Sequence, residues 1–247
     1  MRYALLLLVL AFPLAACGGV SVNAVAKAAT NTSSAGSEHV DINGSVTAAG
    51  QTVKMVGSGD FQSTPKLGAL HLSLTASGRQ ITMDEVLKGL TIYMKSPLFS
   101  AQLPSGKSWM SVDLRKAGNK LGLNTDEFTQ QDPTDLLAAL KKAGSVKKVG
   151  SETINGVDTT HYAVTIDLAK APNGAALEKV ANLKTLPVDV WVDGNNQVRR
   201  LTESYTTTSS GQSVATTMQI DLSNYGEQVD VQVPSAKDTV DMTSLGG

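Results

Sequence analysis

The sequence predicts an α+β fold in which one large, curved antiparallel sheet of about ten strands, a half-barrel, wraps around two or three helices. From Val40 onward, apolar and polar residues alternate with a period of two, which is typical of strands with one buried face. Short turns containing glycine or asparagine separate these segments, and only two segments have strong helical patterning. Because two short helices cover a wide sheet thinly, we expect space between the layers.

The first half of the domain has the pattern of an antiparallel meander. Turns such as Ala49-Gly50 and Ser77-Gly78 separate neighbouring alternating segments. Gly57 and Gly59 indicate a twist, a bulge or a close backbone approach within the second segment. The six predicted strands lie at residues 40–48, 53–61, 70–76, 81–83, 90–94 and 109–112.

The middle of the chain carries the clearest helix signal, over residues 132–144. Asp132 supplies an N-cap acceptor, Pro133 occupies the first helical position, and Gly144 follows as a C-cap. A second helix is predicted over residues 174–183. The apolar faces of these two helices are formed by Leu136, Leu137, Ala139, Leu140 and Ala143 in the first, and by Leu177, Val180 and Ala181 in the second.

Strand patterns resume after the first of these helices. Asn155-Gly156 is a two-residue hairpin signal between two alternating segments, and Gly194-Asn195-Asn196 marks a later turn. Pro234 ends the last alternating segment, and a polar tail follows. These predicted strands lie at residues 146–154, 162–168, 188–192, 198–205, 214–222 and 229–233.

The N-terminus has the pattern of an export signal. Arg2 precedes an apolar segment over residues 4–16, which stops at Cys17, the only cysteine of the chain. This segment is shorter than the roughly 20 apolar residues of a spanning helix, so residues 1–16 predict a signal peptide. The ending Leu-Ala-Ala-Cys at 14–17 resembles the bacterial lipobox, which implies that Cys17 is acylated and becomes the mature N-terminus. The alternative is an ordinary cleaved signal with a stray cysteine.

Composition sets limits on the mature protein. Residues 17–37 are small and polar and predict a lipidated, flexible tether, with a short helix around Val22–Ala29 as an alternative within it, followed by a single domain over 38–247. The chain has 21 lysine and arginine residues against 22 aspartate and glutamate residues, without a basic stripe, so no nucleic-acid partner is expected. With Cys17 modified, no thiol remains to form a disulfide, so the domain must bury a real core.

Three segments of the second half carry a family resemblance. They are ETINGVDTTHY at 152–162, LPVDVWVD at 186–193 and NYGEQV at 224–229. These segments resemble the hairpin, strand and closing motifs of the LppX/LprG group of actinobacterial envelope lipoproteins, which is related in fold to the LolA/LolB lipoprotein carriers. The resemblance covers about residues 38–235. It implies a membrane-anchored protein on the extracytoplasmic face that holds acyl chains of lipids or glycolipids in an apolar cavity and carries or presents them.

The walls of such a cavity would come from the sheet and the two helices. The scarcity of aromatic residues, with 4 Phe, 2 Trp and 5 Tyr, favours unfilled space, although the same residues could close a solid core. The candidate wall residues are Leu136, Leu137, Leu140, Leu177 and Val180 on the helices, facing Leu70, Leu72, Leu74, Val188 and Val190 on strands.

Catalytic and metal-binding patterns are not found in the sequence. The three histidines occupy scattered positions, no Gly-x-Ser-x-Gly elbow occurs, and no cluster has metal-ligand spacing, so we expect neither an enzyme nor a cofactor. Trp191 is either a packed residue of the outer face or a contact surface, and Leu98-Phe99 is a candidate hydrophobic lip.

Two functional hypotheses remain. The first is a lipid-binding lipoprotein that is monomeric and anchored through Cys17, with a membrane transporter left open as a partner. The second is a structural or sensory lipoprotein whose sheet is a protein-interaction platform without lipid cargo.

Overall fold

The computed structural model describes residues 18–116, 145–170, 183–209 and 211–242, in which strands dominate. In chain order the strands are β1 Ser37–Ala48, β2 Gln51–Ser63, β3 Lys66–Ala76, β4 Arg79–Lys88, β5 Thr91–Lys95, β6 Trp109–Asp113, β7 Ser145–Ile154, β8 Val157–Asp167, β9 Thr185–Asp193, β10 Val198–Ser209, β11 Gln212–Ser223 and β12 Thr239–Asp241. The described helices are α1 Gly18–Ser33, α2 Pro97–Ser100 and the 3-10 turn η1 Leu168–Lys170.

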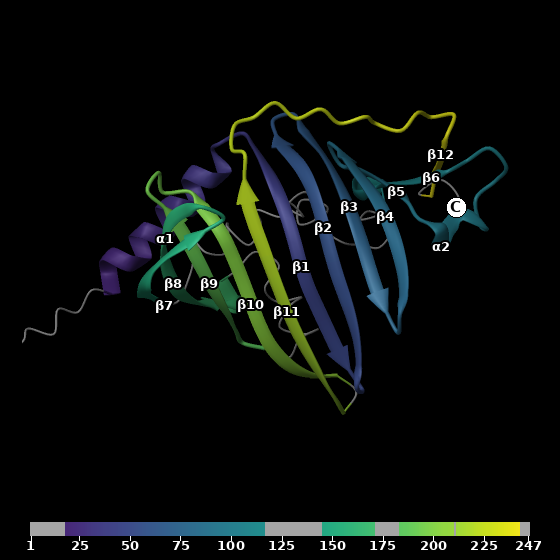
Figure 1. Cartoon of the computed structure of the whole chain (residues 1–247). Helices are drawn as coiled ribbons and strands as arrows, with labels where there is room; N and C mark the ends of the chain where they lie inside the picture. The colour runs from purple at the N-terminus through teal and green to yellow at the C-terminus, as the bar shows by residue number, and fades with distance from the viewer. Residues whose placement is uncertain (1–17, 117–144, 171–182, 210, 243–247) are drawn as a thin grey trace, which may run out of the picture.

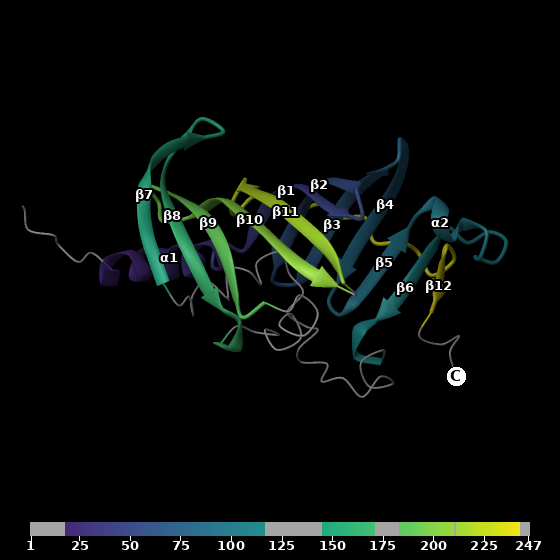
Figure 2. The same ribbon diagram turned by 90° about the horizontal axis from the view of Figure 1, so that it is seen from below.

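The strands form a single 12-stranded sheet in the order β12-β6-β5-β4-β3-β2-β1-β11-β10-β9-β8-β7 (Figure 1). Seen from below, the sheet is an open arc with β7 at one end and β12 at the other (Figure 2). The predicted large, curved and antiparallel sheet is therefore confirmed. One of its strands, β12, pairs in parallel with β6.

Tight turns connect successive strands and set their register. At Ala49-Gly50, Ser77-Gly78 and Asn155-Gly156 both residues have positive φ, as type I′ hairpin turns require. The first half, β1 to β6, is the meander that alternation predicts, and the second half, β7 to β11, is another. The antiparallel pair β1–β11 joins the two meanders into one sheet.

The predicted closing strand at residues 229–233 is wrong. This segment is irregular and runs across the top of the sheet in Figure 1 to the far edge, where Thr239–Asp241 forms β12 beside β6. Alternating valines favour a strand, but a strand needs a free neighbour. Because β11 already pairs with both β1 and β10, no edge is open where the chain leaves β11.

The expected flexible tether is also wrong over residues 18–33. These residues form α1, which contacts β7, β9 and β10. Val25, Ala28 and Ala29 are fully buried, and the Thr32 hydroxyl accepts a hydrogen bond from the backbone N–H of Val198 at 2.9 Å. Small residues allow the helix to approach the sheet closely. Local composition therefore indicated disorder where tertiary contacts produce order.

Three predicted features lie outside the described residues. They are the signal peptide with Cys17, the helix at residues 132–144, and residues 174–182 of the second predicted helix. The predicted cavity residues Leu136, Leu137, Leu140, Leu177 and Val180 lie in these segments. Their roles remain predictions, as does the assignment of residues 38–247 to one domain.

Glycine in the second strand permits a close backbone approach. A Cβ built on Gly59 would overlap the carbonyl oxygen of Ala69 and lie 2.9 Å from the Cα of Leu70 on β3. The backbone atoms of a central strand cannot move aside without breaking the ladder. The glycine pattern that indicated a close approach is therefore explained at this position.

Replacing Gly59 by alanine should lower the free energy of unfolding by about 1–3 kcal/mol, because the added methyl group has no space. The matched control is Gly150→Ala on β7, where a Cβ would meet nothing within 4 Å. Urea unfolding of both variants measures the effect. Similar midpoints for the two variants would show that β2 and β3 are not packed this closely.

Candidate functional site

The two faces of the sheet differ in chemistry. Side chains directly opposite each other on paired strands lie on the same face, so the register defines continuous rows across the sheet. One face carries the apolar rows described next, and we call it the inner face. The opposite face is the outer face. One inner row joins Leu72 to Val190 through Gly57, Ile42, Ile220 and Leu201. A second joins Leu74 to Val188 through Met55, Gly44, Met218 and Glu203.

The register thus brings the five described cavity candidates to one face. Val188 and Val190 are buried in the core cluster that also contains Val25, Ala28 and Ala29 of α1. Leu70 packs against this cluster, and Leu72 is buried outside it. Leu74 is only half-buried. The inner face is therefore a packed core beside α1 and a less covered apolar surface toward β3 and β4.

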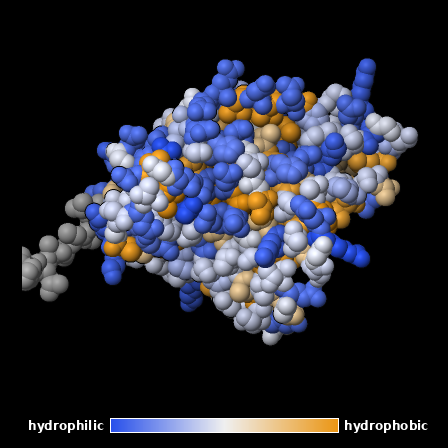
Figure 3. All heavy atoms as spheres, viewed as in Figure 1, coloured by the Kyte–Doolittle hydropathy of each residue, from blue (hydrophilic) through white to orange (hydrophobic). Residues whose placement is uncertain are grey.

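The outer face carries paired polar and charged side chains. His71 and Asp84 are cross-strand neighbours whose Nδ1 and Oδ1 atoms lie 2.6 Å apart, and the Arg200 guanidinium donates two hydrogen bonds to the Asp221 carboxylate at 2.5 and 2.6 Å. Figure 3 shows this side with hydrophilic atoms predominating and hydrophobic atoms in scattered patches. Paired charges of this kind keep one face of an antiparallel sheet in water.

Trp191 is a packed residue of the outer face. Its side chain stacks on His161 with ring centroids 4.2 Å apart and donates from Nε1 to Glu152 at 3.1 Å. The residue is only 8% exposed, so of its two interpretations the packed one is correct. Leu98, by contrast, is 55% exposed on α2, and its role as a lip remains a prediction.

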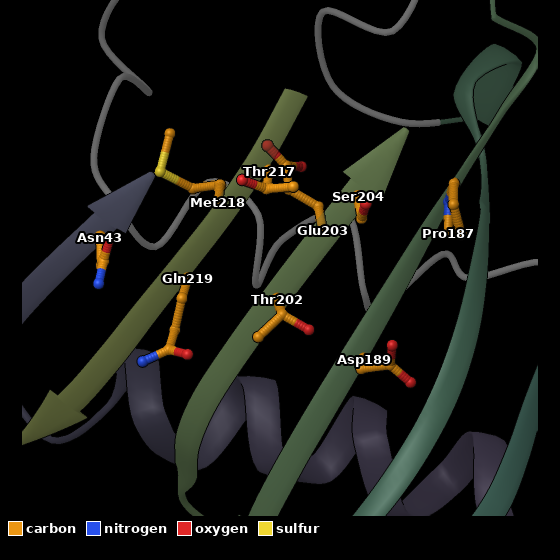
Figure 4. A pocket seen from close by; sticks show the side chains of 9 residues that line it. All are labelled: Asn43, Pro187, Asp189, Thr202, Glu203, Ser204, Thr217, Met218 and Gln219. Atoms are coloured by element: carbon orange, nitrogen blue, oxygen red, sulfur yellow. The ribbon is translucent and has the colours of Figure 1, made fainter. Parts of the chain in front are cut away.

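Open grooves lie on the outer face, and the one beside α2 has a mainly apolar lining that includes Pro97 and Leu103. Another, of about 370 Å³, crosses β1, β11, β10 and β9 and is shown in Figure 4. Of its lining residues, Asn43, Asp189, Thr202 and Gln219 lie on the side of the sheet away from the apolar rows, whereas Glu203 and Met218 belong to one of those rows. The carboxylate, hydroxyl and amide groups of this lining do not suit acyl chains, so the inner face is the better candidate site than this groove.

Two carboxylates interrupt the apolar inner face and were missed by the sequence analysis. Glu85 lies opposite Leu70 and Met94, and Glu203 lies opposite Val188 and Met218. Burial raises the pKa of both carboxyl groups. The ionised forms are therefore less favourable in the folded chain than in the unfolded chain. The stability that the two neutral carboxyl groups permit is lost as the pH rises through the raised pKa. The sequence signal for Glu203 was its position in the alternation, because it stands between Leu201 and Tyr205 where an apolar residue is expected.

The described residues carry neither a metal cluster nor a membrane-spanning helix. No group of three or more His, Cys, Asp or Glu side chains in these ranges is arranged to hold a metal ion. Of the helices in the described part of the chain, none has the length and hydropathy that a membrane span requires.

The fold and the two faces of the sheet define the class of protein. It is an open β half-barrel with a mainly apolar inner face and a polar and charged outer face. Residues 21–231 match the model of the LppX_LprAFG lipoprotein family, and the chain belongs to this family. Membership implies an envelope protein associated with a membrane. The resemblance seen in the sequence motifs is thereby confirmed.

Two proteins of Streptomyces are similar in sequence. The chain is 34% identical over 157 residues to an uncharacterized 31.2 kDa protein of Streptomyces griseus, covering 57% of this chain and 50% of that protein. It is 26% identical over 242 residues to a putative lipoprotein of Streptomyces coelicolor, covering 92% of this chain and 77% of that one. The chain thus spans about half the length of the first of these relatives.

A solved structure supports the fold. The crystal structure of lipoprotein LppX from Mycobacterium tuberculosis is similar at a TM-score of 0.55 and 17% identity, covering 87% of this chain and 99% of that chain. At this identity the likeness concerns the fold alone.

Proposed function

We propose that this protein is a non-catalytic, membrane-anchored lipoprotein of the extracytoplasmic face that binds acyl chains of lipids or glycolipids against its inner face and carries or presents them in the envelope. The observation that carries this proposal is the mainly apolar inner face, which extends from the packed core beside α1 to half-buried residues such as Leu74. Covering such a surface with acyl chains is favourable by about 25 cal/mol per Å².

The chemistry of the two faces supports the same proposal. Charged side chains on the outer face satisfy one another, whereas apolar side chains prevail on the inner face. A lipid head group buried without partners would be costly, so it should stay near the margin of the sheet while the chains enter. Cys17 would supply the anchor in this proposal.

The experiment compares a bulky residue on the two faces of one strand. In the full chain carrying Cys17→Ala, Leu74→Trp places an indole on the inner face, and Thr75→Trp places it on the outer face. After incubation with triolein, organic extraction and mass spectrometry measure the bound lipid. We expect Leu74→Trp to reduce the bound lipid by about twofold or more with little change in melting temperature, because the indole takes ligand space, whereas overpacking a solid core costs about 1–3 kcal/mol.

Each possible failure has a distinct meaning. A chain without Trp substitutions that takes up no lipid contradicts the carrier proposal and favours the interaction platform. A Leu74→Trp variant that melts far below Thr75→Trp shows that this part of the inner face is a solid core.

A further inference from the structure

One carboxyl group lies near the middle of an apolar row of the inner face. On one side of Glu203 the row continues through valines of three strands, and on the other side it reaches Met218. Figure 4 shows the Glu203 and Met218 side chains next to each other on β10 and β11. The residues of this row from β7 to β11 are Val146, Val164, Val188, Glu203 and Met218.

The Glu203 carboxylate has no hydrogen-bond or ion-pair partner among the residues that the structure describes. The ladder partners Val188 and Met218 carry no polar side-chain group that could donate to it. The next inner-face residue of β10 is Tyr205, whose hydroxyl forms a hydrogen bond with Thr216. A half-buried carboxylate left in this state costs free energy, and buried polar groups in native proteins normally have partners.

We propose that Glu203, with Tyr205 and Thr216 beside it, forms a polar subsite on the inner face that accepts a hydrogen bond from an acyl lipid whose polar group is a donor and bears no negative charge, such as a free glycerol hydroxyl. The inference rests on the proposed function and specifies its ligand class.

Placement and charge determine which lipids suit this subsite. Met218 flanks the carboxylate on one side and is only half-buried, so an acyl chain of the same ligand can lie against it, whereas Val188 on the other side is already buried in the core. A carboxylate is an acceptor only, so it needs a donor from the ligand. A phosphate or carboxylate of a lipid would face a like charge in a poorly solvated place, where repulsion is strong. The subsite therefore selects a donor and rejects an anion.

The test uses three lipids that share two oleoyl chains. They are 1,2-dioleoylglycerol, which has one free hydroxyl; its 3-acetyl ester, which has none; and dioleoyl phosphatidic acid, which is anionic. The full chain carrying Cys17→Ala is incubated with an equimolar mixture, and mass spectrometry measures the lipids retained. Glu203→Leu removes the acceptor, Glu203→Gln removes only the charge, and Glu227→Gln is the matched control at an exposed position.

The protein with Glu203 intact should retain dioleoylglycerol over its acetyl ester by about fivefold or more, since a hydrogen bond to a charged group is among the stronger ones. Glu203→Leu should bring this ratio close to one, and Glu203→Gln should increase the retained phosphatidic acid several-fold. Glu227→Gln should change neither. Because removing a half-buried charge relieves a cost, both Glu203 variants should melt no lower than the parent chain.

An unchanged ratio in Glu203→Leu, with lipid still bound, overturns the subsite and leaves the proposed function standing. A parent chain that binds none of the three lipids overturns the proposed function and the subsite together.

Discussion

Ala28→Glu should destabilise the protein by more than about 3 kcal/mol, which is a large part of the stability of a typical domain. Ala28 is fully buried where α1 meets the sheet, in the cluster that also contains Val25 and Val190. A glutamate there would place an unpaired carboxylate in the core and would also need space that alanine does not occupy. Thermal melts of the full chain measure the change.

The matched control is Asn23→Glu, which adds the same side chain at an exposed position of α1. It should leave the melting temperature nearly unchanged. If both variants melt at the temperature of the parent chain, α1 is not part of the core. For the same reason, a soluble fragment that begins after α1 would lose Val25, Ala28 and Ala29 from the core and should be unstable.

Cys17→Ala should move the protein from the membrane fraction to the soluble fraction. Two or three acyl chains on one cysteine hold a protein stably on a bilayer, at about 0.8 kcal/mol per buried CH₂. Within the described ranges, no helix is long and apolar enough to cross a membrane. Fractionation of cells, with immunodetection in the pellet and the supernatant, measures the shift.

Asn23→Ala serves as the control, since it changes a nearby residue but not the lipobox. It should remain in the membrane fraction. A Cys17→Ala variant that stays in the pellet through detergent-free washes would show that lipidation is not the anchor.

Much of the sheet could be predicted from local patterns. The alternation of apolar and polar residues located the strands of both meanders, and pairs such as Asn155-Gly156 located the turns between them. The same alternation assigned Leu70, Leu72, Leu74, Val188 and Val190 to buried or half-buried positions. These features depend on neighbours in the chain, because pleating and turn geometry are properties of a few consecutive residues.

The candidate site could be predicted only in part. That five of the ten predicted cavity residues share one face depends on the strand order and register, which join Leu72 to Val190 across six strands. The isolation of Glu203 likewise becomes visible only when Val188 and Met218 are placed on either side of it. Period-two alternation states which residues share a face of one strand, but not which strands are neighbours.

The sequence by itself determined the class of fold, the positions of most strands and turns, and the family. The tertiary structure decided that residues 229–233 are irregular, that Gly18–Ser33 is a docked helix, and that Trp191 is packed against His161. Each of these depends on a partner distant in the chain: a free sheet edge, an apolar surface beneath a helix, or a ring on a neighbouring strand. Local sequence patterns reflect interactions between residues that are close in the chain, whereas these outcomes follow from contacts that exist only after the chain has folded.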